Sequence, residues 1–216
     1  MTLAFLDPSP RVGGDAVGSS RWVPVARSPM EAQAVAAGAR MERRDGWNVA
    51  ASFDGPDHAA VVGFADVSHV RKIELQGDVG QATLGTATRA GSAWWCGLTP
   101  TRALIVGGTT QLDGVDVTGA FCALTIVGPQ ARETIARFCA LDLRPQVTPV
   151  TGLRPGSVAR TPGLVLCEAE ERYLVLAGAA YGEYLWTVVA DAAGHLGGGP
   201  IGVDDLPELP EDLPRA

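Results

Sequence analysis

The chain is 216 residues long, with 27 glycines and 15 prolines; 46% of its residues are hydrophobic and 19% are charged. This composition excludes a disordered chain and a coiled coil, and the length suffices for one domain whose core needs no disulfide or metal. The 24 acidic and 17 basic residues give a formal net charge of −7. The sequence therefore lacks the basic stripe of a nucleic-acid-binding protein and the cationic cluster that binds anionic membranes.

The chain divides into a central domain and two tails. Residues 1–27 are predicted to be a flexible N-terminal tail, because their short apolar start lacks the basic region of a targeting signal. Residues 28–199 form the domain, and residues 200–216 form an acidic, Pro-rich tail that repeated prolines and like charges keep extended. Leucines recur through this second tail, and they either rest on a partner surface or are solvated. No apolar stretch is long enough to span a bilayer, so we expect a cytoplasmic protein.

Start and stop signals mark three helices. Residues 28–31 resemble a capping box with proline at the first helical position, which predicts a helix from residue 29 to about residue 43. A second helix is expected after Pro129, where apolar residues recur at i, i+4, i+7 and i+8. A third is expected over about residues 181–196, ended by three successive glycines.

Short strands are expected between these helices. Residues 72–76 show the period-two alternation of a half-buried strand, and residues 121–127 are more uniformly apolar, as in the centre of a sheet. Three further apolar segments, residues 104–106, 164–167 and 173–176, complete the set. Together they predict an α+β fold class, in which antiparallel sheets carry helices on one side or at one end.

A faint internal repeat runs through the domain. An Asp-Val-Ser segment at residues 66–68 and an Asp-Val-Thr segment at residues 116–118 each lead through an apolar strand to a glycine, Gly77 or Gly128. Glycines and threonines weaken any helix over residues 78–90 of the first unit. We interpret the pattern as a degenerate strand–helix–strand duplication, intact once and eroded once.

The cysteines and histidines form no pattern of metal ligands. Cys96, Cys122, Cys139 and Cys167 have no ligand-like spacing to one another or to a histidine, so no metal site is expected. With no secretion signal, four reduced and mostly buried thiols are expected. His69 is expected to be a hydrogen-bonded structural histidine, since no nucleophile or carboxylate partner is evident.

Two further groups of residues are interpreted as structural. Glu168, Glu170 and Glu171 are expected to form a solvated hairpin turn. Glycines at residues 107–108 and 197–199 lack the strand–GxGxxG–helix context of a phosphate-binding loop, so no such loop is expected.

Two ordered sets of residues carry a family resemblance. One set resembles the opening of the glycine cleavage aminomethyltransferase, the T-protein: Ser28-Pro29-Met30, Gly38 to Met41, Gly46-Trp47, Asp66-Val67-Ser68-His69 and Lys72. The other set is similar to the gamma subunit of heterotetrameric sarcosine oxidase: Val115 to Thr118, Leu124, Val127 to Arg132, Leu141 to Leu143, Pro155 to Thr161, Tyr181 and Tyr184 to Trp186. That subunit is itself similar to the folate-binding half of the T-protein. The resemblance implies a T-protein-like folate-binding domain.

The chain departs from the T-protein pattern at its acidic residues. The family carries an Asp-Asp pair on a hairpin, but residues 85–98 contain no acid. The family's Thr-Gly-Glu segment, whose Glu grips the pterin ring, should follow Arg160-Thr161, where Pro162, Gly163 and Leu164 stand instead. Proton transfer needs a titratable group within hydrogen-bond reach. The resemblance therefore implies a folate-protein scaffold without catalytic residues.

A non-catalytic gamma-type subunit of a heterotetrameric sarcosine (N-methyl amino acid) oxidase fits these matches and departures. The resemblance implies alpha, beta and delta subunits as partners, with this chain packed on the folate-bearing alpha subunit. FAD, FMN and NAD are expected on those partners, and tetrahydrofolate is a candidate cofactor here. Two alternatives stay open. One is a small tetrahydrofolate-dependent aminomethyltransferase using Asp66 or Asp116; the other is a folate-binding accessory protein of the iron–sulfur repair type.

Six residues are candidates for binding, and none is assigned a catalytic role. Arg160 and Thr161 are candidates for contact with the folate tail or a partner carboxylate. The interface candidates are Trp94, Trp95, Tyr181 and Trp186. Since adjacent strand residues point to opposite faces, one of the two neighbouring tryptophans should belong to the core and the other to an interface.

Overall fold

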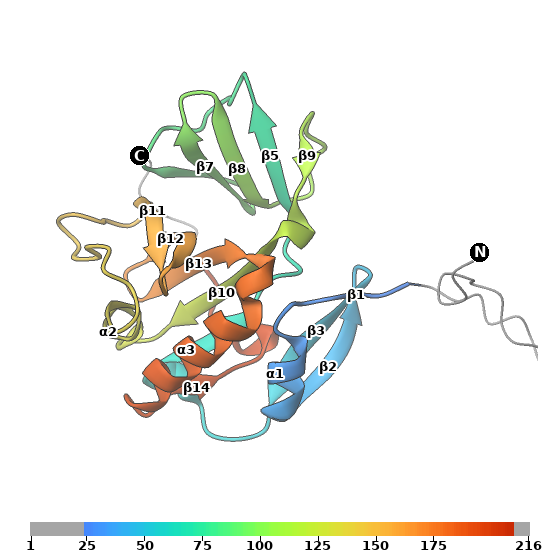
Figure 1. Ribbon diagram of the computed structural model, residues 1–216, viewed down its shortest axis with the longest axis vertical. Coiled ribbons are helices and arrows are strands. Elements are labelled where there is room, and N and C mark those ends of the chain that lie inside the picture. The colour runs from blue at the N-terminus through green and yellow to red at the C-terminus, as the bar shows by residue number, and fades with distance from the viewer. Residues whose placement is uncertain (1–23, 210–216) are drawn as a thin grey trace, which may run out of the picture.

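The computed structural model describes residues 24–209, which form three sheets with helices beside them (Figure 1). The smallest sheet has the order β1–β3–β2, with β1 at Ala26–Arg27, β2 at Ala39–Arg44 and β3 at Trp47–Phe53. The α-helices are α1 Glu31–Ala36, α2 Ala131–Ala136 and α3 Gly182–Gly194. Short 3-10 turns are η2 His58–Ala60, η3 Thr118–Ala120, η4 Ala179–Tyr181 and η5 Val203–Asp205.

Two larger sheets hold the rest of the strands. The six-stranded sheet has the order β11–β12–β13–β10–β4–β14: β4 Gly63–Asp66, β10 Phe121–Val127, β11 Leu153–Val158, β12 Thr161–Ala169, β13 Arg172–Gly178 and β14 Gly199–Pro200. The five-stranded sheet has the order β6–β7–β8–β5–β9: β5 Lys72–Gln76, β6 Ala87–Ala90, β7 Ala93–Thr99, β8 Arg102–Gly107 and β9 Val115–Asp116. Figure 1 shows the five-stranded sheet above the six-stranded one, with α2 and α3 beside the latter.

The predicted strands and the antiparallel fold class are confirmed. Each expected strand lies within β5, β8, β10, β12 or β13. Neighbouring strands of the two large sheets pair antiparallel except β14 with β4, and in the smallest sheet β1 pairs parallel with β3. Residues 78–86 hold no helix, whereas α2 follows Gly128 in the second unit. The derivation of the two units from one duplicated unit stays a prediction.

The first predicted helix is wrong over its second half. Gly38 adopts φ +90°, a left-handed conformation that glycine tolerates, and it ends α1 two residues after Ala36. The chain then runs as β2 and returns as β3 through Asp45 and Gly46, both at positive φ, +49° and +81°. Asp-Gly between two strands is a strong hairpin signal. The alanines before Gly38 favour a helix, and for this reason the predicted helix extended over β2, the first strand of this hairpin.

The six-stranded sheet separates two apolar cores. Toward the helices, Phe64 packs edge-on against Trp186 of α3 with ring centroids 5.0 Å apart, and Val165 and Val175 belong to the same cluster. Toward the five-stranded sheet, Leu164 and Leu166 pack with residues of β7 and β8. Strand β12 thus alternates between the two cores, as a central strand must when both faces are covered.

The segments at the two ends differ from the predicted tails. Residues 1–23 and 210–216 lie outside the described residues. The described parts of both predicted tails join sheets: β1, within residues 1–27, pairs with β3, and β14, which reaches residue 200, pairs with β4. Leu206 and Leu209 pack against the core between the two large sheets. Neither open alternative, a partner surface or solvent, describes these two leucines, because both rest on the chain's own core.

Reduced cysteines and the absence of a bilayer-spanning segment were expected from the sequence, and both points can be examined in the described residues. All four cysteines are buried and free of disulfides, and burial raises the pKa of the Cys96 thiol to about 12, which keeps it protonated and inert. Across residues 24–209 no helix has both the length and the apolar character needed to cross a bilayer.

Candidate functional site

A cavity of about 220 Å³ lies between the six-stranded and the five-stranded sheets. Apolar residues from both sheets line most of it, and Val203, Leu206 and Leu209 close it from the C-terminal side. Five polar side chains also reach the cavity: His69, Ser92, Thr125, Glu168 and Arg172. A largely apolar cavity with a few convergent polar groups is the usual form of a small-molecule site, so this is the candidate functional site.

Glu168 is a buried carboxylate in the wall of this cavity. It lies on the same face of β12 as Leu164 and Leu166, at a β-bulge where the register with β13 shifts between Cys167 and Ala169. The residue is 4% exposed. Burial raises the pKa of Glu168, while the charge of Arg172 and hydrogen bonds from Arg172 and Trp94 oppose the rise.

The sequence pattern alone did not predict this residue. Of the three glutamates expected in a solvated turn, Glu170 and Glu171 are exposed, but Glu168 is not. Strand β12 continues past residue 167, where the expected strand ended, and its alternation carries Glu168 onto the same face as Leu164 and Leu166. The available signal was Arg172, four residues further on, which forms the ion pair that a buried acid requires.

Arg172 connects the buried carboxylate to the C-terminal segment. Its Nε donates to Glu168 Oε2 at 3.0 Å, and its Nη1 donates to the main-chain oxygen of Pro207. The side chain of Arg172 is 15% exposed. The guanidinium therefore neutralises Glu168 inside the cavity and holds the segment that covers it.

His69 faces the same cavity from the loop between β4 and β5. Burial lowers the pKa of its imidazole, and Asp66 opposes this effect, so the ring is held toward its neutral form. Among residues 24–209 it has no hydrogen-bond partner, unlike the hydrogen-bonded histidine expected. Lys72 fixes this loop, because its Nζ donates to the main-chain oxygens of Ser68 at 3.0 Å and Val70 at 2.7 Å. Burial lowers the pKa of Lys72 to about 8.

The two predicted cofactor-binding residues lie outside this cavity. Arg160 is exposed in the tight turn between β11 and β12, at φ +62°. Thr161 is buried, and its hydroxyl donates to the oxygen of Val158 at 2.9 Å. Since Thr161 satisfies the turn itself, it has no free donor to offer a ligand, and the role of Arg160 stays a prediction.

The four interface candidates separate into two pairs. Trp94 and Trp186 are only 3% and 6% exposed, so both are core residues and neither presents its ring to a partner. Trp95 is half-buried on the opposite face of β7, as the alternation predicted, and Tyr181 is 43% exposed. The interface prediction therefore rests on Trp95 and Tyr181.

The two aspartates considered as alternative acids have local structural roles. Asp66 Oδ1 accepts from the amide of Ser68 at 2.9 Å, and Asp116 Oδ1 accepts from the amide of Thr118 at 2.9 Å and its hydroxyl at 2.7 Å. Neither lines the cavity. Within residues 24–209, no group of three or more histidines, cysteines or acids is placed to hold a metal ion.

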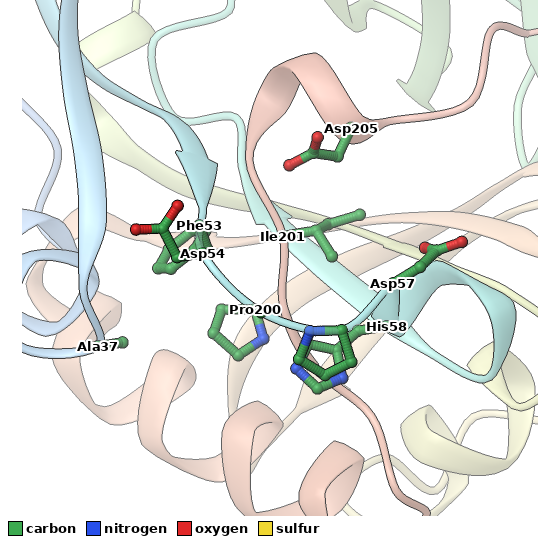
Figure 2. A pocket seen from close by; sticks show the side chains of 10 residues that line it. Ala37, Phe53, Asp54, Asp57, His58, Pro200, Ile201 and Asp205 are labelled. Atoms are coloured by element: carbon green, nitrogen blue, oxygen red, sulfur yellow. The ribbon is translucent and has the colours of Figure 1, made fainter.

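A second pocket, of about 490 Å³, opens between the end of β3, η2 and β14 (Figure 2). Asp54, Asp57 and Asp205 surround it, but in Figure 2 their carboxylates point in different directions and not toward one point. Asp57 accepts from the amide of Ala59 and Asp205 from that of Gly202. Because two of these acids already serve turns, the cavity between the sheets remains the better candidate.

Solved structures identify the fold. No family model and no curated protein matches the sequence. A chain of heterotetrameric sarcosine oxidase from Corynebacterium sp. U-96, in complex with pyrrole 2-carboxylate, matches with a TM-score of 0.62 and 19% identity, over 79% of this chain and 96% of that one. Glycine cleavage system aminomethyltransferase T from Bartonella henselae matches with a TM-score of 0.64 and 13% identity, over 84% of this chain.

The chain has the T-protein-like fold. The suspected similarity to sarcosine oxidase and the T-protein is thus confirmed at the level of structure. This chain spans only 60% of the length of the aminomethyltransferase, but it spans nearly the whole of the matching sarcosine oxidase chain. At these identities the likeness establishes the fold, and function has to be argued from the site.

Proposed function

We propose that this chain is a non-catalytic gamma-type subunit of a heterotetrameric sarcosine (N-methyl amino acid) oxidase. One observation carries the proposal: the match covers 96% of one chain of such a heterotetramer, so the likeness extends over almost a whole subunit of that complex. The partners would be alpha, beta and delta subunits in the cytoplasm, which would carry FAD, FMN and NAD. This chain would pack on the folate-bearing alpha subunit.

The cavity supports a role without catalysis. Hairpin residues 85–98 contain no acid, and the buried carboxylate of Glu168 is held by Arg172 and Trp94 of the same chain. A general acid or base must reach the substrate proton within hydrogen-bond distance. Because its oxygens already serve the fold, Glu168 acts as a structural ion pair in this proposal.

Co-expression with candidate alpha, beta and delta flavoprotein subunits from the same genome tests the proposal. We expect oxidation of N-methyl amino acids by the assembled complex, and loss of that activity when this chain is omitted. Full oxidase activity from the flavoproteins alone would contradict the proposal. The amine substrate is varied in the same assay, since the fold does not select one.

A small tetrahydrofolate-dependent aminomethyltransferase is the second candidate, and Glu168 is the observation that favours it. The raised pKa of this buried carboxyl and its position in the same cavity as His69 are features of acid–base sites. The purified chain is assayed for tetrahydrofolate-dependent release of a one-carbon unit, with Glu168→Gln as the paired variant. Activity that the variant abolishes would establish this function and replace the subunit proposal.

A further inference from the structure

The segment Val203 to Leu209, here called the strap, crosses the cavity between the sheets. The chain reaches the strap through a firmly held anchor. There, β14 pairs with β4, the amide of Ile201 donates to the oxygen of Phe64 at 3.0 Å, and Gly202 packs directly on the main chain of Ala51. Arg44 grips Asp204 through both carboxylate oxygens, each at 2.6 Å. The first part of the strap is therefore fixed to the six-stranded sheet and to the smallest sheet.

The second part of the strap is held differently. Leu206 is extended, with φ −69° and ψ 126°, and within the described residues the amides of Leu206, Glu208 and Leu209 donate no hydrogen bond. Pro207 has no amide hydrogen to donate. Residues 206–209 rest on two features: the leucine side chains in the cavity and the hydrogen bond from Arg172 to the oxygen of Pro207.

We propose that residues 206–209 are a displaceable plug. In the closed form they fill the apolar part of the cavity, and they swing out about residues 202–205, which stay fixed. Segments with few backbone hydrogen bonds are the ones that open locally without global unfolding. Opening frees one face of the Arg172 guanidinium and uncovers Trp94 and Leu174, while the Glu168–Arg172 ion pair stays in place. This inference does not depend on the proposed subunit function.

The contacts that the plug makes indicate the chemical class of a ligand that could displace it. Leu206 and Leu209 supply apolar surface, and the Pro207 oxygen supplies one acceptor to Arg172. A competitor must provide both, so the site would take a small apolar molecule that carries one strong hydrogen-bond acceptor, such as an anionic oxygen. The dye 8-anilinonaphthalene-1-sulfonate combines an aromatic body with a sulfonate and serves as the probe.

The test compares variants at alternate positions of the strap. Leu206→Ser with Leu209→Ser removes the two partly buried side chains that reach the cavity, whereas Glu208→Ser makes the same residue at an exposed position of the same segment. A ligand that binds only the open form has an apparent Kd inversely proportional to the open fraction. We expect dye affinity to rise by at least about tenfold in the double variant and to stay unchanged in Glu208→Ser. Equal affinity in all three proteins would overturn the proposal.

Two measurements on the unaltered chain give an independent readout. Peptides covering residues 203–209 should exchange amide hydrogens faster than those from β12 and β13. Saturating dye should also speed cleavage after Glu208 by a glutamate-specific protease, because a displaced strap can enter the active site of the protease. If saturating dye leaves this cleavage rate unchanged, the proposal is wrong, and this test applies even if the double variant does not fold.

Discussion

The two faces of the six-stranded sheet differ in how closely they are packed and in whether they carry polar side chains. The face toward α3 is closely packed: Phe64, Trp186 and Val189 belong there to one large apolar cluster. The face toward the five-stranded sheet contains a cavity with an imidazole, a carboxylate and a guanidinium. One face of the sheet therefore supplies most of the packing that stabilises the domain, and the other face keeps a cavity that a ligand can enter.

The largest effect should come from the closely packed face. Phe64→Ala removes a fully buried ring from its contact with Trp186, and it should lower the free energy of unfolding by about 3–5 kcal/mol. Urea denaturation measures this loss. Leu84→Ala, at a side chain 60% exposed, is the control and should change stability by less than about 0.5 kcal/mol. A loss below about 1 kcal/mol for Phe64→Ala would contradict the assigned difference between the faces.

The ion pair in the cavity should give the next largest effect. Arg172→Met leaves Glu168 buried without its partner and should cost about 3 kcal/mol at pH 7. A carboxyl whose folded pKa is raised binds its proton more tightly when folded, so stability falls as pH rises through the window between its unfolded and folded pKa values. The cost should therefore shrink at pH 5.

Adding Glu168→Gln to Arg172→Met provides the control for this prediction. Without a charge to bury, the double variant should lose the additional dependence on pH between 5 and 7. Unfolding followed at both pH values measures the difference. An equal cost at pH 5 and pH 7 for Arg172→Met alone would show that Glu168 does not carry a buried charge.

Lys72 tests the loop that presents His69 to the cavity. Its pKa is lowered to about 8 in the fold from an ordinary value of 10.5. Between these values the unfolded chain binds a proton that the folded chain has released, so Lys72 makes stability rise with pH across this window. Relative to Lys72→Met, the unaltered chain should gain about 1–3 kcal/mol between pH 8 and pH 10.5. Parallel curves for the two proteins would contradict this.

The smallest effect on stability should come from the surface. Tyr181→Ala removes a side chain that is 43% exposed and should change the free energy of unfolding by less than about 0.5 kcal/mol. If Tyr181 anchors a partner, the same change should weaken assembly with the flavoprotein subunits by roughly tenfold or more. Leu84→Ala is the matched exposed control. Equal assembly by both variants would remove Tyr181 from the interface.

The amino-acid sequence predicted the strands but not the features that depend on distant contacts. Alternation over residues 72–76 and the apolar run at residues 121–127 report local burial, and both strands formed as predicted. The inward position of Glu168 depends on β12 continuing to Ala169, two residues beyond the expected strand, and the docking of Leu206 depends on a cavity made by two sheets. Pairing with β13 sets where β12 ends, so a local window of sequence fixes neither feature. The Asp45-Gly46 hairpin was readable, but the alanine-rich segment before Gly38 outweighed it.

Assembly with partner subunits is the central claim, and native mass spectrometry tests it most directly. The chain is co-expressed with candidate alpha, beta and delta subunits from the same genome, and the mass of the purified intact complex is measured. The account predicts one dominant assembly that contains this chain together with three different partner subunits. Recovery of the chain as a free species beside a complete flavoprotein complex would contradict the account.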